Sequence, residues 1–166
     1  MPLGLDFSRY NFAQAGEPHR WGDYQIGEKI DHIDGVTMED AEHMMATRLW
    51  QNTAKVHFDA TARPDGKRLI YGGHVISMAR GLPFNGLANA QMIVGLNAGA
   101  HANPCFSGDT VRAWSEVLDK AEIAAPGVSA LCDCGWWPQK AVRRSSCADR
   151  TGNIMQIHCL ISIIGF

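Results

Sequence analysis

The chain has 166 residues, of which 46% are hydrophobic and 19% are charged, and its formal net charge is -2. This length allows one domain with a substantial core and is too short for two. The small negative charge and the lack of a basic run argue against a nucleic-acid-binding surface. No segment reaches the roughly 18 apolar residues of a membrane helix, and the first residues lack the apolar core of a signal peptide. We therefore expect a soluble, cytoplasmic protein without nucleic-acid or membrane partners.

The cysteines do not predict a metal site or a disulfide framework. Their number, five, is odd, which fits poorly with closed disulfide pairing. Cys132 and Cys134 lie in the C-terminal part of the chain, together with Cys147, His158 and Cys159. A single residue between Cys132 and Cys134 is tighter spacing than a zinc knuckle has, so no metal ligand is predicted.

The first elements expected in chain order are a short strand at 29–36 and a helix at 38–49. Thr37-Met38-Glu39-Asp40 has the hydroxyl-x-x-acid form of a helix N-cap, in which the hydroxyl accepts a free backbone N–H. Apolar residues then recur at helical spacing, which predicts a buried stripe: Met38, Ala41, Met45 and Leu49.

A second helix is expected after the turn at Pro64-Asp65-Gly66, where proline and glycine suit the turn geometry. It opens at Gly72-Gly73 and should end or kink near Pro83, because proline lacks the amide donor that a helix needs. One face of this helix is apolar and should be buried: Val75, Ile76, Met78, Ala79 and Leu82.

From residue 91 onward the pattern changes to strands, at 91–97 and 110–118. The second strand alternates well, with Val111, Ala113, Ser115 and Val117 on one face. Helices followed by strands, with one long buried helix, predict an α+β fold in which a sheet wraps around that helix.

Five segments together carry a resemblance to a known family: RWGDYQIGEKIDHIDG, EDAEHMMATRLWQNTAKVHFD, KRLIYGGHVISMAR, FNGLANA and NAGAHANPCFSGDTVRAWSEVLDK. From about Leu5 to Ser129 the chain resembles the mesaconyl-CoA hydratase (β-methylmalyl-CoA dehydratase) branch of the MaoC-like hydratases. The resemblance implies the hotdog fold, a curved antiparallel sheet around a central helix. Members usually carry two hotdog halves in one chain, and this sequence is similar to the second half only.

The C-terminal segment departs from that family, so we predict a hotdog domain at 1–131 and a non-family tail at 132–166. When the tail's codons are shifted by one base, synonymous choices permit peptides that do resemble the missing strands: VRLRLVA, LRGPDGKY and LLDLDYW. We therefore predict that the tail is a frameshifted translation, the alternative being a divergent C-terminus. The hotdog sheet is expected to be incomplete at its C-terminal strands, with unpaired edges.

The candidate site lies between Gln51 and His74. Backbone amides at the start of a helix can stabilise an oxyanion, and a glycine such as Gly73, with Gly72 before it, permits a close approach. A tight turn would explain the glycine pair equally well. An imidazole such as His57 can exchange a proton near neutral pH, although a lone histidine is more often structural.

The resemblance places the family's catalytic histidine at His57 and a water-orienting residue at Asn52, where many MaoC-like hydratases have aspartate. An asparagine side chain can orient water but cannot accept its proton. Asp59 is a possible assisting acid and is otherwise a loop carboxylate.

The implied activity is reversible addition of water to an enoyl-CoA thioester, with mesaconyl-CoA (2-methylfumaryl-CoA) and β-methylmalyl-CoA as the expected pair. No metal or redox cofactor is needed for this reaction. The alternatives are an acyl-CoA thioesterase and a non-catalytic hotdog fragment or partner subunit. The expected partners are the acyl-CoA substrate and either a second copy, as a homodimer, or another hotdog half.

Overall fold

The computed structural model describes residues 9–101, 103–125, 128–136, 139–140 and 155–163. Its helices are α1 (Phe12–Ala15), α2 (Asp40–Leu49), α3 (Gly72–Gly81) and α4 (Phe84–Leu87), with 3-10 turns η1 (Trp21–Asp23), η2 (Lys55–His57) and η3 (Ala60–Ala62). Its strands are β1 (Lys29–Thr37), β2 (Ala90–His101), β3 (Thr110–Ala125), β4 (Val128–Trp136), β5 (Gln139–Lys140) and β6 (Met155–Ile163). None of the helices within these ranges is long and apolar enough to span a membrane.

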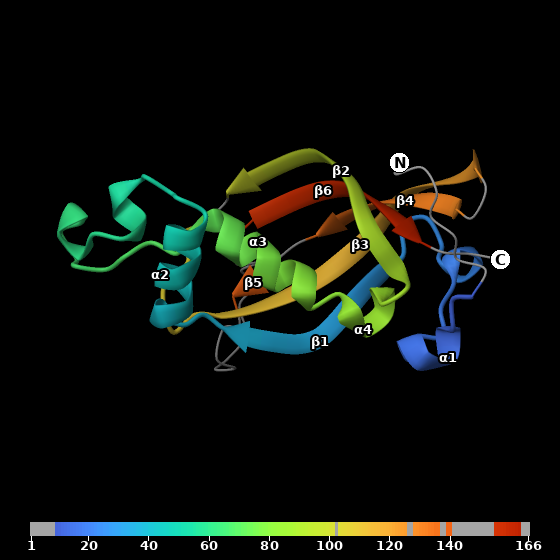
Figure 1. The fold of residues 1–166 in the computed structure, drawn as a ribbon, viewed down its shortest axis with the longest axis horizontal. Helices are drawn as coiled ribbons and strands as arrows, with labels where there is room; N and C mark the ends of the chain where they lie inside the picture. The colour runs from blue at the N-terminus through green and yellow to red at the C-terminus, as the bar shows by residue number, and fades with distance from the viewer. Residues whose placement is uncertain (1–8, 102, 126–127, 137–138, 141–154, 164–166) are drawn as a thin grey trace.

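The strands form one curved sheet in the order β1-β3-β4-β6-β2, and β5 pairs with β3 outside this path. The neighbouring strands along the path are antiparallel. Helix α3 lies across the concave face of the sheet, and α2 lies at one end of it together with the loop that follows (Figure 1). The predicted α+β architecture, with a sheet curved around one helix, is confirmed.

The alternation predicted for 110–118 determines how β3 packs against α3. Val111, Ala113, Ser115 and Val117 are at most 2% exposed, whereas Arg112 on the opposite face is exposed. Two buried clusters result. One contains Tyr24, Leu87, Ala90 and Val117, and the other contains Met38, Ile70, Val75, Cys105 and Val111. The second cluster forms the wall behind the candidate site.

Helix α2 differs from the prediction at its start and in the face that it buries. Thr37 does not cap the helix, because it belongs to β1 and its hydroxyl bonds the hydroxyl of Thr110 at 2.9 Å. Of the predicted stripe, Met45 and Leu49 are 63% and 70% exposed. The buried face consists instead of His43, Ala46 and Thr47. Small and polar side chains therefore face the neighbouring elements. The spacing of apolar residues cannot predict a buried face of this kind.

The described backbone includes strands from the C-terminal part of the chain, where the sheet was expected to be incomplete. Strand β4 crosses the predicted boundary at 131/132, and β6 lies between β4 and β2 in the sheet. Both segments contain apolar residues at alternate positions, a pattern that strands show. The rest of the predicted tail, 137–138, 141–154 and 164–166, lies outside the described residues.

Candidate active site

His57 ends the η2 turn in the long connection between α2 and α3. Its Nδ1 lies 2.8 Å from the carbonyl oxygen of Leu69. A carbonyl oxygen can only accept, so Nδ1 carries the proton and donates it in this bond. In the neutral ring Nε2 is therefore left with its lone pair, which is the state required of a general base.

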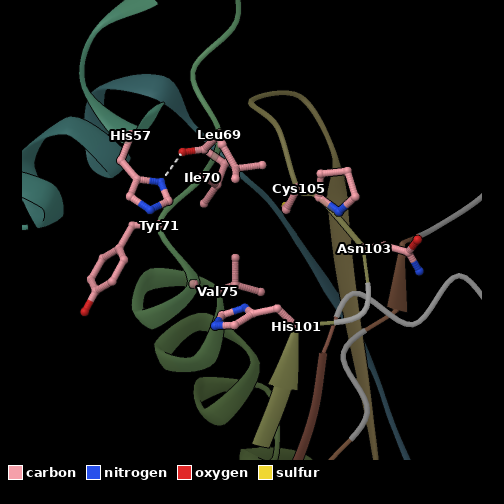
Figure 2. A pocket seen from close by; sticks show the side chains of 10 residues that line it. His57, Leu69, Ile70, Tyr71, Val75, His101, Asn103 and Cys105 are labelled. Atoms are coloured by element: carbon pink, nitrogen blue, oxygen red, sulfur yellow. Dashed lines mark hydrogen bonds between the residues drawn. The ribbon is translucent and has the colours of Figure 1, made fainter. Parts of the chain in front are cut away.

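The imidazole of His57 lines a cavity of about 470 Å³, within the usual size range for small-molecule sites. Its walls come from the segment before α3, the first turn of α3, the end of β2 and the loop that follows β2. Figure 2 shows His57 and His101 on two sides of this cavity, with the start of α3 between them in this view. The lining residues are His57, Leu69, Ile70, Tyr71, Gly72, Val75, His101, Asn103, Pro104 and Cys105.

The N-terminus of α3 opens onto the same cavity. Tyr71 is the N-cap residue, and the helix begins at Gly72 and Gly73. The first N–H groups of a helix have no acceptor within it and carry the positive end of its dipole, so they form a site for a developing negative charge. Gly72 lines the cavity directly.

Both glycines are also required by close packing. A Cβ added to Gly72 would lie 2.0 Å from Cε1 of His101, and one added to Gly73 would lie 2.5 Å from Cζ of Tyr71. The first turn of α3 is therefore enclosed by two aromatic side chains, and neither glycine has room for a larger residue.

Asn52 and Asp59 lie outside this cavity. The Oδ1 atom of Asn52 accepts the backbone N–H of Ala54 at 2.9 Å, and the residue lines a separate hollow together with Phe58. Asp59 caps η3 by accepting the hydroxyl of Thr61 at 2.6 Å and its backbone N–H at 2.9 Å. These bonds lower the pKa of Asp59 and keep its carboxylate engaged locally. The structure thus brings His57 and Gly72 to one cavity, whose lining residues do not include Gly73. It places Asn52 and Asp59 elsewhere.

Other residues near the site were not singled out from the sequence. His101, at the end of β2, lines the cavity, and no local pattern in the sequence marked it. The ring of Tyr71 has its centroid 5.8 Å from that of His57.

A second layer of imidazoles lies behind His57. The ring of the fully buried His43 is 6.3 Å from the rings of both His57 and His74. Burial, and then the neighbouring His57 and His74, lowers the pKa of His43 from 6.5 to about 4. Burial also lowers the pKa of His74. The described residues contain no group of three or more metal-ligating side chains arranged to hold an ion.

Comparison with known structures identifies the fold. A putative MaoC domain protein dehydratase from Chloroflexus aurantiacus superposes with a TM-score of 0.87 and 41% identity over 98% of this chain. The domain has a hotdog fold. It covers 49% of that structure, as expected for one half of a double-length relative. A protein of Mycobacterium tuberculosis described as a double hotdog superposes with a TM-score of 0.68 at 18% identity, which supports the fold alone.

Two curated relatives agree with the resemblance found in the sequence. The chain is 80% identical over 131 residues to a mesaconyl-CoA hydratase of Cereibacter sphaeroides, and 55% identical over 130 residues to a β-methylmalyl-CoA dehydratase of Chloroflexus aurantiacus. These matches include 79% and 76% of this chain but only 38% and 36% of the relatives' lengths. No protein-family model matches the chain.

Proposed function

We propose that this hotdog domain contributes the catalytic half of a hydro-lyase that reversibly adds water to an enoyl-CoA thioester. The proposed substrate pair is mesaconyl-CoA and β-methylmalyl-CoA. The observation that carries the proposal is the shared cavity of His57 and the N-terminus of α3, where the ring of His57 has its Nδ1 proton held by Leu69. The identity to two curated relatives supports the choice of acyl group.

In the proposed reaction the thioester carbonyl oxygen accepts hydrogen bonds from the first N–H groups of α3. These bonds strengthen as the oxygen gains negative charge, so they stabilise the enolate more than the substrate. Nε2 of His57 takes a proton from water while the water oxygen bonds to the β-carbon. The imidazolium then gives that proton to the α-carbon. Water is thereby added across the double bond, and His57 returns to its neutral form.

Within this scheme His57 moves the proton without help from a carboxylate. The water-positioning role of Asn52 and the assistance of Asp59 stay predictions, since both side chains bond within their own turns. Single substitutions separate these roles. Asn52→Ala should lower kcat if the amide reaches the water, and Asp59→Asn should have little effect if the carboxylate only caps η3.

We also propose that the chain works as a pair, either with a second copy or with another hotdog half, because it spans about half of the double-length relative. Size-exclusion chromatography with light scattering tests the homodimer. The expected cytoplasmic location is part of this proposal, and cell fractionation tests it.

The decisive assay follows mesaconyl-CoA with the full chain, a His57→Gln variant and a version with the restored reading frame. Hydration removes the absorbance of the conjugated double bond without releasing thiol, and His57→Gln should lose at least ~100-fold in kcat, the usual contribution of general acid–base catalysis. Release of free CoA would instead identify a thioesterase. Binding without either change in every version would leave a non-catalytic partner domain and refute the hydratase.

A further inference from the structure

One buried contact beside the cavity is not used by the proposed reaction. His43 on α2 is 0% exposed, and its Nε2 atom lies 2.9 Å from the backbone nitrogen of Tyr71. Tyr71 is the N-cap of α3, so this bond joins the face of α2 to the N-terminus of the helix that opens onto the cavity. His43 and Tyr71 are 28 residues apart along the chain, so the bond is a tertiary contact.

The bond determines the protonation state of His43. A backbone N–H can only donate, so Nε2 must accept and must carry no proton. The proton of the neutral ring is then on Nδ1, for which the described residues offer no hydrogen-bond acceptor. A protonated ring could not accept this bond. The surrounding groups do not favour a positive charge on His43 either, since His57 on η2 and His74 on α3 are its ionisable neighbours.

The residue that His43 holds touches both parts of the candidate site. The ring of Tyr71 lies 5.8 Å from that of His57, and it occupies the space against which Gly73 packs. A displaced Tyr71 would therefore move the first N–H groups of α3 and the wall beside His57 together. Burying the imidazole of His43 with one ring nitrogen unpaired costs folding free energy. An apolar residue would avoid this cost if the position served only packing.

We propose that His43 is a positioning residue, a neutral imidazole that accepts the Tyr71 amide and thereby orients the N-terminus of α3 toward the cavity. It is not among the residues that line the cavity, and it acts through Tyr71. The catalytic importance of this orientation rests on the proposed hydratase function. The bond between His43 and Tyr71, and its effect on the start of α3, do not depend on that function.

The test compares His43→Gln and His43→Leu in the full chain. The Oε1 atom of glutamine reaches about as far from Cβ as the Nε2 of histidine and can accept the Tyr71 amide, whereas leucine keeps the volume and cannot accept. His32→Leu is the matched control. His32 is also 0% exposed, but its ring bonds the carbonyl of Asn85 and the hydroxyl of Ser115, away from the cavity.

Amide hydrogen exchange and nitrogen-15 spectra of the histidine rings give readouts that require no activity. We expect His43 to carry its proton on Nδ1 at neutral pH. In His43→Leu the Tyr71 amide should exchange at least ~10-fold faster and the Gly72 and Gly73 amides should shift, while His43→Gln and His32→Leu stay near wild type. A proton on Nε2 of His43 in the wild-type chain would overturn the proposal even if a variant failed to fold. Unchanged Tyr71 and Gly73 amides in His43→Leu would overturn it as well.

Kinetics with mesaconyl-CoA add a second readout. The positioning role predicts that His43→Leu lowers kcat at least ~10-fold and changes KM less than threefold, with recovery in His43→Gln. Equal kinetics in the leucine and glutamine variants would refute the role in catalysis. If the wild-type chain does not turn over mesaconyl-CoA, the proposed function fails, and the amide and ring-nitrogen measurements still decide the role of His43.

Discussion

Mild acid should destabilise this domain through His43, and the size of the effect follows from its environment. The pKa of the folded-state imidazole is lowered from 6.5 to about 4. The unfolded chain therefore binds a proton between these values while the folded chain does not, so stability falls as the pH falls from about 6.5 toward 4. At about 1.4 kcal/mol per pKa unit, the loss between pH 7 and pH 5 is about 2 kcal/mol from this residue.

The measurement is urea denaturation of wild type and His43→Gln at pH 7 and pH 5. Glutamine does not titrate, so the wild type should lose about 2 kcal/mol more than the variant between these two pH values. His32 and His74, whose pKa values are also lowered by burial, act in the same direction and are present in both proteins. Asp59 and Asp65 also have lowered pKa values, and their contributions are lost only below about pH 4, the ordinary range of a carboxylate.

Met45→Gln is the control for this titration, since Met45 lies on the same helix, is 63% exposed and has no titratable group. It should show the same pH dependence as wild type. If His43→Gln loses as much stability as wild type between pH 7 and pH 5, the fold does not hold His43 neutral, and the predicted pH dependence is wrong.

Two further predictions concern packing. Gly73→Ala should cost about 1–3 kcal/mol and move the Tyr71 ring, because its Cβ would lie 2.5 Å from that ring. Gly81→Ala in the same helix meets nothing within 4 Å and should stabilise by up to about 1 kcal/mol. Thermal melts of both variants check the pair, and equal effects would contradict the packing argument. Leu87→Ala, in the buried cluster with Tyr24, should cost about 2–5 kcal/mol without changing acyl-CoA affinity below its melting temperature. A parallel loss of affinity in calorimetry would show that this cluster and the cavity are coupled.

The features that the sequence predicted well are those determined by local patterns. Alternation along 110–118 placed Val111 and Val117 in the core, and the glycine pair with the apolar residues after it placed α3. The spacing of apolar residues gave the wrong prediction where tertiary packing determines which helix face is buried. Helix α2 ends where predicted but begins two residues later, and its buried face is formed by His43, Ala46 and Thr47, residues without an apolar period.

The sequence predicted only part of the candidate site, because tertiary packing also determines which side chains meet there. His57 and Gly72 share a cavity because the chain between them turns back through the bond from His57 to Leu69. Asn52 is five residues from His57 along the chain, but the η2 turn intervenes, and the two side chains line different hollows. The contact of His43 with Tyr71 joins two helices and has no local pattern in the sequence.

The predicted change of reading frame has consequences for both the gene and the fold. The strong sequence likeness spans 131 residues, whereas β6 lies at 155–163 and pairs with β4 and β2. The shifted frame supplies VRLRLVA, in which apolar and charged residues alternate as they do in a strand with one buried face. In the present frame the same place reads LCDCGWW, residues 131–137, which has an adjacent tryptophan pair and lacks the strict alternation of VRLRLVA.

Sequencing the coding DNA across Ser129 to Cys134 should therefore reveal an inserted or deleted base relative to the frame that encodes the strand-like peptides. The frame-restored chain should also unfold at a higher urea concentration than the chain with the present tail, because its last strands place their apolar side chains on one face of the sheet. An uninterrupted frame in the DNA, together with no gain in the urea midpoint after restoration, would establish the present tail as a divergent but fitting end of the sheet.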